Sequence, residues 1–356
     1  MNTPTTRRNH GIDALRILST FMIVMLHCLG AGGRHGVIRQ SSSPHYRVCW
    51  FLEILCYVGP NCYALISGCV NIRTHFSISG FIYLWLKMIM YTLVLKCVFI
   101  LISDSTFKTN VPSFINLLHL KQFSAIVLPI STEMHWYFTA YAGIYFFIPF
   151  IHNETTPLQA TMSVCILVLF YSVIPSYCGR DIMKTNKGYS SIWLFVLYLI
   201  GSCIRRISIK SFWKLVSLLV IYFLSTTLSF LCQIDILKIK WFGSANYTSP
   251  VIVLSSISLV LFFYNLSSLP PVWIRATEFM APLTFGINML HSYVVGDLVS
   301  PLLRNLPSLN HATVILLYIL IAVLTILFVG LVDLLCTQLL RILNIKKRLL
   351  LMDKLL

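Results

Sequence analysis

The sequence predicts an all-α polytopic membrane protein, with about ten transmembrane helices in one bundle. Three observations lead to this prediction. The chain has 356 residues, of which 57% are hydrophobic and only 11% are charged. Its mean hydropathy is +0.82, and long apolar runs recur from one end to the other. Ordinary soluble domains carry about 25% charged residues, so the composition excludes that class.

The apolar runs have the length that a helix needs to cross a hydrocarbon core of roughly 30 Å, which is about 20 residues. Short polar stretches separate them. The sixth run is short and the last is overlong. The expected spans are 13 to 31, 48 to 70, 80 to 103, 134 to 152, 159 to 178, 190 to 204, 212 to 232, 249 to 267, 279 to 299 and 312 to 340.

The spans are expected to form a single integral-membrane domain over residues 1–356, because no linker rich in Gly, Ser or Pro divides the chain. The first span follows Arg7 and Arg8, as a signal peptide would, but it ends in "HCLGAGG" rather than a small-x-small cleavage site. We therefore expect it to be retained. The long stretch from Ser103 to Met134 has the spacing of an interfacial or re-entrant helix.

The formal net charge of +16 comes from basic residues in loops and at helix ends. This placement favours contact with anionic lipid headgroups and not with nucleic acid, although attraction of a polyanionic substrate stays open. With ten spans both termini share a side, and three basic clusters fall on it: Arg7 with Arg8, Arg205 to Lys214, and Arg341 to Arg348. The positive-inside rule then predicts a plasma-membrane protein with both termini in the cytoplasm.

The eleven cysteines are spread through the spans without any C-x-x-C pair. This pattern argues against a zinc ribbon or a disulfide framework, and we expect no metal site. The cysteines are interpreted as small apolar packing residues.

Ionisable residues inside the apolar runs are the candidates for function. Such a residue at mid-span costs about 2.5 to 3.5 kcal/mol on insertion scales, so it usually faces the protein interior. For His291, Asp297 and Asp333 we expect hydrogen bonds between helices. The complete set is Arg16, His27, Glu53, Lys87, Lys96, Glu133, His135, His291, Asp297 and Asp333.

Arg16 and His27 lie eleven positions apart on the first span, which places both on one helix face, roughly 16 Å apart in height. We expect them to face the same cavity. Asp13, three residues before Arg16, is placed to pair with it. The alternatives are a snorkelling interfacial arginine and a histidine that only bonds a neighbouring helix.

Four stretches occur in an order that resembles the membrane acyltransferase family 3. They are "GIDALRILSTFMIVMLH", with an Arg followed after ten residues by His; "NCYALISGCV", with its serine-glycine pair; "EMHWYFTAYAGIYFFIP"; and "FGINMLHSYV", with its late-helix histidine. The resemblance covers residues 9 to 340. The chain departs from the family where an arginine-rich stretch commonly enters the third helix, because "FIYLWLKMIMY" offers only Lys87.

The resemblance implies an acyl-CoA-dependent membrane O-acyltransferase. Members transfer an acyl group, usually acetyl, from cytoplasmic acyl-CoA to a hydroxyl of a cell-envelope or exopolysaccharide glycan. The expected partners are therefore membrane lipid, acetyl-CoA as co-substrate and a glycan acceptor, with no tightly bound cofactor. The sequence identifies neither the acceptor nor the oligomeric state.

The expected catalytic residues are His27 and Arg16. An imidazole can take a hydroxyl proton near neutral pH, or it can carry the acyl group itself, and both routes stay open for His27. Arg16 fits either the CoA phosphates or the developing oxyanion. Lys87 is a weaker candidate for phosphate, as a point charge without the fork of arginine.

The expected substrate-binding residues include Glu133, His135 and Trp136, where the long loop re-enters the bundle. Glu133 is placed to orient a histidine or a sugar, and Trp136 to stack on a sugar ring. For Trp136, a place in the interfacial aromatic belt of a membrane protein is an equally good explanation. For Glu133, a favourable interaction of its carboxylate with the helix dipole at an N-terminus is an equally good explanation. Glu53 is added because a carboxylate at that depth needs a partner.

The rival interpretation is a transporter or flippase for an amino acid or a glycan, since intramembrane ionisable residues also mark transport paths. Transporter folds built from duplicated halves show internal repeats. The sequence shows none by inspection, which favours the enzyme.

Overall fold

The computed structural model of this chain describes residues 8–34, 45–70, 77–103, 126–128, 135–147, 156–243, 245–266, 268–299 and 309–352. Over these ranges every regular element is a helix and none is a strand, so the predicted all-helical class is confirmed. The long stretch after Ser103 falls almost entirely outside the described residues, and so does the helix that we expected there.

The regular elements follow the predicted order along the chain. In sequence they are α1 (His10–Arg34), α2 (Tyr46–Cys56), α3 (Val58–Val70), α4 (Ile78–Ser103), α7 (Trp136–Tyr145), α8 (Pro157–Val168), η3 (Leu169–Val173), α9 (Ile174–Cys178), η4 (Asn186–Gly188), α10 (Ser191–Ile204), α11 (Phe212–Gln233), α12 (Lys240–Gly243), α13 (Pro250–Tyr264), α14 (Pro271–Met280), η5 (Ala281–Leu283), α15 (Thr284–Val294), η6 (Val295–Val299), α17 (His311–Ile342) and α18 (Ile345–Met352).

Six helical stretches in the described part of the chain are long and apolar enough to cross a membrane. They are His10–Gly30, Tyr46–Val70, Ile78–Val98, Pro157–Cys178, Phe212–Gln233 and His311–Ile342. Helices α10 and α13 are apolar but shorter, with 14 and 15 residues. At 1.5 Å per residue they rise roughly 21 to 23 Å, less than the hydrocarbon core. Helix length thus supports six spans, and the predicted count of about ten is not confirmed.

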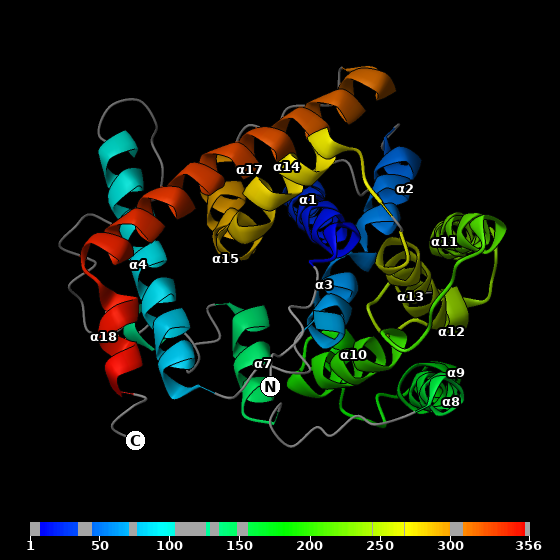
Figure 1. The fold of residues 1–356 in the computed structure, drawn as a ribbon. Coiled ribbons are helices and arrows are strands. Elements are labelled where there is room, and N and C mark those ends of the chain that lie inside the picture. The colour runs from blue at the N-terminus through cyan, green and yellow to red at the C-terminus, as the bar shows by residue number, and fades with distance from the viewer. Residues whose placement is uncertain are drawn as a thin grey trace.

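Helix α1 occupies the centre of the bundle and packs against α2, α3, α13, α15 and α17 (Figure 1). Its apolar side chains Leu15, Val24, Met25 and Cys28 are almost completely shielded. The first run was predicted to cross the membrane, and in the structure it is surrounded by other helices. Its polar residues Asp13, Ser19 and Thr20 are accordingly buried against protein.

Helices α3 and α10 approach each other closely because each carries a glycine at the contact. A Cβ on Gly68 would lie 2.0 Å from the carbonyl oxygen of Tyr198, and one on Gly201 would lie 2.1 Å from that of Leu65. Small residues at helix interfaces let two backbones pack in this way. The contact fixes the height of α3, which carries Tyr63 into the interior.

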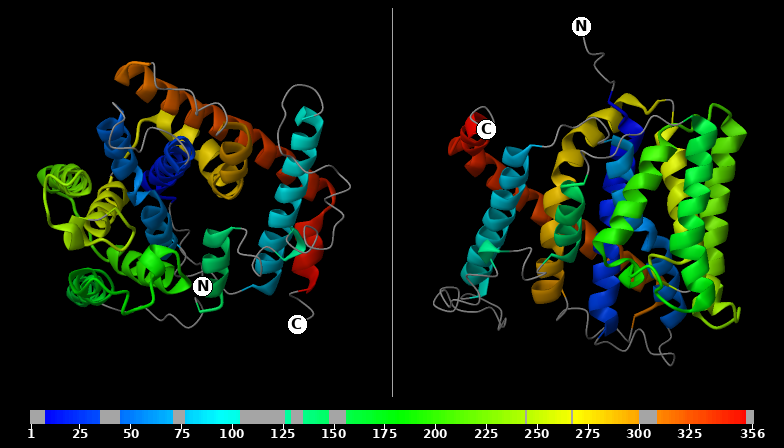
Figure 2. Two further views of the ribbon diagram at one scale, coloured as in Figure 1. Left: turned by 180° about the vertical axis from the view of Figure 1, so that it is seen from behind. Right: turned by 90° about the horizontal axis from the view of Figure 1, so that it is seen from below.

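The start of α1 and the ends of α10 and α13 meet at one end of the bundle. The Asn9 side-chain amide donates to the carbonyl oxygen of Tyr264 at 3.0 Å, and the Tyr264 hydroxyl donates to the carbonyl oxygen of Arg205 at 3.4 Å. In the right-hand view of Figure 2, α17 runs toward this end and meets α18 there. The described basic residues Arg8 and Arg205 and the helix α18 therefore lie toward one end of the bundle. Arg7 lies outside the described residues, and the assignment of that end to the cytoplasm stays a prediction.

Candidate active site

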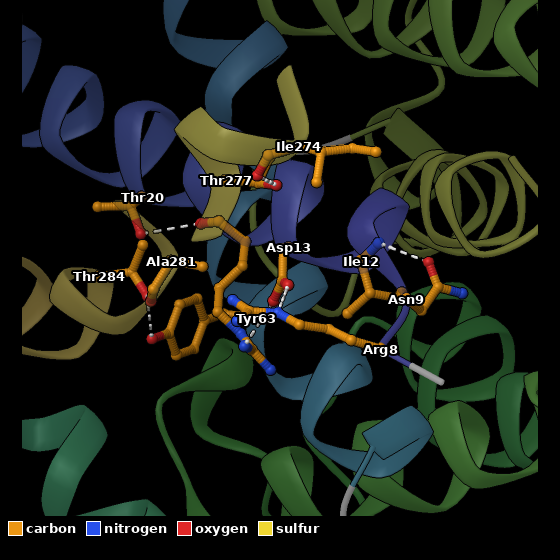
Figure 3. Close-up of polar contacts among 11 residues, drawn as sticks. Arg8, Asn9, Ile12, Asp13, Thr20, Tyr63, Ile274, Thr277, Ala281 and Thr284 are labelled. Carbon is orange, nitrogen blue, oxygen red and sulfur yellow. Dashed lines mark hydrogen bonds and ion pairs between the residues drawn. The ribbon is translucent and has the colours of Figure 1, made fainter. Parts of the chain in front are cut away.

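Asp13 joins two arginines at the start of α1 (Figure 3). Its carboxylate oxygens accept a hydrogen bond from Arg8 Nε at 2.5 Å and from Arg16 Nη1 at 3.2 Å. The Asp13 side chain is 7% exposed and that of Arg16 is 26% exposed. The predicted pair of Asp13 and Arg16 is confirmed. Two guanidinium groups share one carboxylate, so the cluster keeps a net positive charge.

Arg16 lines a cavity of about 330 Å³, here named the arginine cavity. The wall is formed by aromatic, small and apolar side chains from α3, α4, α7, η5 and α15. Its described lining residues are Arg16, Tyr63, Ser67, Leu84, Tyr137, Phe138, Tyr141, Ala281, Pro282, Thr284, Phe285 and Met289. A positive group thus stands at the edge of a largely apolar chamber inside the bundle.

His27 lines a second cavity of about 230 Å³, here named the histidine cavity. The His27 side chain is exposed to it, and it also receives side chains from α3, α7, α15 and two loops. In the described part of the chain no cluster of three or more His, Cys, Asp or Glu is arranged as a metal site. The described lining residues are Ile23, Leu26, His27, Pro60, Tyr63, Trp136, Tyr137, Tyr189, Tyr247, Asn288, Met289 and His291.

The two cavities adjoin, because Tyr63, Tyr137 and Met289 line both. The rings of Tyr63 and Tyr137 meet edge to face with centroids 6.0 Å apart. The expectation that Arg16 and His27 face the same cavity therefore needs revision. They face two adjoining cavities, and the two tyrosine rings belong to the lining that these cavities share.

An aromatic cluster forms part of the wall of the histidine cavity. Trp136 contacts Tyr189 with ring centroids 4.7 Å apart, and Tyr189 contacts Tyr247 at 5.1 Å. Asn61 holds this wall in place, because its amide donates to the Tyr247 carbonyl oxygen at 2.8 Å. Gly188, at φ +102°, lies so close that a Cβ there would stand 2.4 Å from Tyr247 Cβ. The loop before α10 thus packs directly on the cavity wall.

Helix α15 brings two polar side chains to the histidine cavity. The His291 ring lies 4.6 Å from the His27 ring, at an interplanar angle of 83°. Asn288, one turn earlier, also lines this cavity, has both side-chain polar atoms shielded from solvent, and lies close to the Tyr63 hydroxyl. The interhelical hydrogen bond that we expected for His291 is replaced by a 3.0 Å contact within α15, from Nδ1 to the Ile287 oxygen.

The remaining predicted binding residues lie in different places. Trp136 lines the histidine cavity, as above. His135 precedes it as the N-cap of α7, is 7% exposed, and contacts the Tyr293 hydroxyl through Nε2 at 3.4 Å. Glu53 is buried on α2 and is not among the described lining residues of either cavity. Glu133 lies outside the described residues.

Lys87 is paired inside the bundle. Its Nζ lies 3.3 Å from an Asp333 carboxylate oxygen, and the Tyr91 hydroxyl donates to the same carboxylate. The Lys87 and Asp333 side chains are 12% and 2% exposed. The pair connects α4 with α17 close to Phe285, which lines the arginine cavity. This geometry gives Lys87 a structural partner and keeps it out of the lining of that cavity.

Several lining residues were not predicted as site residues. Tyr63 and Asn288 lie within the quoted motifs "NCYALISGCV" and "FGINMLHSYV", so a signal was present in the sequence. Tyr189 and Tyr247 lie in loops, at the end of one polar stretch and just before α13. Only the folded chain brings those two beside Trp136.

Taken together, apolar helices around a central helix with polar side chains in internal cavities define a polytopic membrane protein with an enclosed site. Residues 9–333 match the family model described as an acyltransferase domain, so the chain belongs to the acyltransferase 3 family. It is therefore a membrane acyltransferase. Neither the curated proteins nor the solved structures include a match to this chain.

Proposed function

We propose that this protein transfers an acetyl group from acetyl-CoA to a hydroxyl of a cell-envelope or exopolysaccharide glycan. The single observation that carries the proposal is the arrangement along α1. A positive cluster at Arg16 and an accessible histidine at His27 line two adjoining cavities. In this proposal the protein lies in the plasma membrane with both termini in the cytoplasm, and acetyl-CoA binds from that side.

In this proposal the acyl donor, acetyl-CoA, binds with its phosphates at the arginine cavity. CoA carries several phosphate charges, and a guanidinium group binds phosphate with two parallel hydrogen bonds. Asp13 binds Arg16 at 3.2 Å and also binds Arg8, so this cluster has two positive charges and one negative charge. The arm that carries the thioester is an extended chain. It can bridge the roughly 16 Å of helix rise between Arg16 and His27.

The thioester and its acyl group react in the histidine cavity. Its volume of about 230 Å³ lies below the range of about 300 to 1,000 Å³ that is typical of ligand pockets. A small acyl group such as acetyl fits this size better than a long chain. Asn288 lines the cavity beside Tyr63, and its side-chain amide can donate a hydrogen bond to the thioester carbonyl oxygen as negative charge develops there.

The glycan acceptor binds against the aromatic cluster of Trp136, Tyr189 and Tyr247. Amphipathic rings of this kind offer flat apolar faces together with hydroxyl and indole donors. A sugar ring presents a C–H face and hydroxyl edges, so it complements such a wall. His27 then has two open routes: it takes the acceptor proton as a base, or it carries the acyl group as an acyl-imidazole.

The test is transfer of labelled acetyl from acetyl-CoA to membrane glycans by the purified protein in liposomes. We expect His27→Ala to abolish transfer and Arg16→Ala to weaken acetyl-CoA binding. Matched controls are His311→Gln, at the start of α17, and Arg275→Ala, on the exposed surface of α14. Size-exclusion elution and thermal unfolding in detergent check that each variant is folded.

A transporter would give a different set of results in the same liposomes. It would neither bind acetyl-CoA nor transfer label to any of several envelope acceptors, and it would move an amino acid or a glycan across the bilayer. That outcome would refute the proposed activity.

A further inference from the structure

His291 has a fixed tautomer in the structure. It is 3% exposed, and its Nδ1 lies 3.0 Å from the carbonyl oxygen of Ile287. A carbonyl oxygen only accepts hydrogen bonds, so Nδ1 must be the nitrogen that carries the proton. In the neutral ring the lone pair is then on Nε2. His291 therefore presents one defined hydrogen-bond acceptor on the nitrogen that faces away from its own helix backbone.

That acceptor is buried without a partner. Nε2 of His291 is shielded from solvent and makes no hydrogen bond within the described part of the chain. Buried polar atoms are nearly always hydrogen-bonded, so each exception calls for a reason such as a catalytic role or a missing ligand. His291 also lines the histidine cavity. A substrate hydroxyl in this cavity would supply the missing donor.

The two histidines of the cavity differ in a way that suits two different tasks. His27 is exposed to the cavity, while His291 is buried and locked by its own helix. Their ring centroids are only 4.6 Å apart, so both rings reach the same small volume. A nucleophile beside a base whose orientation is fixed is the general arrangement for covalent catalysis.

We propose that His27 carries the acyl group and that His291 is the base for the acceptor hydroxyl, an assignment that rests on the proposed acyltransferase function. In the first step the unprotonated ring nitrogen of His27 attacks the thioester carbonyl carbon and the C–S bond breaks. The CoA thiolate leaves with the electron pair and takes the proton that the acylated imidazole loses.

In the second step the acceptor hydroxyl gives its proton to Nε2 of His291, while its oxygen forms a bond to the acyl carbon. The bond from that carbon to the His27 nitrogen breaks, and the electron pair returns to the ring. The proton on His291 then passes to His27, so both rings end neutral. Nδ1 of His291 stays bonded to the Ile287 oxygen throughout.

The experiment separates the two steps in liposomes with labelled acetyl-CoA. In His291→Gln and His291→Asn, neither of which provides a base, we expect free CoA to appear once per protein. Label should remain on the protein and be released by hydroxylamine, and transfer to the glycan should fall at least about 10²-fold. Asparagine keeps an amide donor near the Ile287 oxygen, so it guards against loss of folding. His311→Gln is the matched histidine control.

Three results would overturn the assignment. Transfer at the wild-type rate in both variants would remove His291 from the reaction. If folded variants lose both the release of CoA and the transfer to the glycan, His291 acts in the first step or in the structure and not as the base of the second step. Failure of added imidazole to restore transfer in His291→Ala, in which the ring has left a space, would argue against a base. If the wild type itself neither binds acetyl-CoA nor transfers label, the proposed function fails first.

Discussion

Tyr63 on α3 and Tyr137 on α7 meet edge to face between the arginine cavity and the histidine cavity. The Tyr63 hydroxyl also lies 3.2 Å from Thr284 Oγ1, which fixes the ring against α15. The two rings also line the histidine cavity, where the proposed reaction holds the acyl group, so they bound the space that this group can occupy. They are the residues that we expect to limit the length of the acyl chain.

Replacing Tyr63 by Ala should enlarge the histidine cavity and admit longer acyl groups. One methylene in a fitted apolar pocket changes selectivity roughly 10- to 200-fold, so the ratio of butyryl to acetyl transfer should rise at least about tenfold. The measurement is transfer from each acyl-CoA under the same conditions, with unfolding temperature as a check. Tyr177→Ala, at a side chain that is 73% exposed, is the control. An unchanged ratio in a folded variant would show that the ring is not the limit.

Replacing Arg16 by Lys should weaken the donor site while preserving its charge. Lysine lacks the planar fork that binds both Asp13 and a phosphate, and a hydrogen bond to a charged group contributes about 1.5 to 3 kcal/mol. We expect KM for acetyl-CoA to rise about tenfold or more, with kcat changed much less. Steady-state kinetics at several salt concentrations measure this. A fall in kcat at constant KM would instead place Arg16 at the developing oxyanion.

The sequence predicts those parts of the site that depend on local spacing. The pair of Asp13 and Arg16 follows from a separation of three residues on one helix, and the structure contains it. The relation between Arg16 and His27 follows from eleven residues of helix rotation. Neither feature depends on how other helices pack, and so both can be derived from the chain alone.

The rest of the site depends on tertiary contacts that the sequence does not display. The lining that the two cavities share includes Tyr63 and Tyr137, which lie on helices far apart in the chain. The unpaired nitrogen of His291 arises because Nδ1 bonds within its own helix, whereas hydropathy predicts only that the histidine is buried. The predicted count of about ten spans is not confirmed, because helix length supports six in the part of the chain that the structure describes. Helices α10 and α13 are apolar but have only 14 and 15 residues, and many of their side chains are buried against other helices.

Replacing Asn288 by Leu should lower kcat and leave KM nearly unchanged. Leucine has a similar size but offers no donor to the carbonyl oxygen, and removal of one such donor costs about 10²- to 10³-fold in kcat. The measurement is the rate of labelled acetyl transfer at saturating acetyl-CoA. Ser292→Ala on the same helix is the control. A change confined to KM would assign Asn288 to ground-state binding.

Lys87 and Asp333 should make coupled, non-additive contributions to the free energy of unfolding. Removing one partner of a buried pair leaves an uncompensated charge and costs about 3 to 5 kcal/mol. We expect Lys87→Met and Asp333→Asn each to lower the unfolding temperature strongly, and the double variant to lower it by less than the sum. A double-mutant cycle of unfolding in detergent measures the coupling. Additive effects would mean that the 3.3 Å contact contributes little.

The loop before α10 depends on Asp181, which organises the residues leading to Tyr189. Partial burial raises the pKa of Asp181, but hydrogen bonds from Thr185 and Asn186, with help from Lys184, outweigh burial and hold the pKa below its ordinary value. Three contacts of 2.6 to 2.8 Å make up these bonds. The ionised form is therefore favoured in the folded loop.

The stabilisation from Asp181 should be complete above the unfolded pKa of about 3.9 and should be lost as pH falls through the lower folded pKa. Asp181→Asn should accordingly loosen residues 179–190 at pH 6, seen as faster hydrogen exchange there than in the wild type at the same pH. The difference in unfolding temperature between the two proteins should shrink from pH 6 toward pH 3. Asp235→Asn, in the turn after α11, is the control. A difference that stays constant with pH would show that Asp181 contributes through packing and not through its charge.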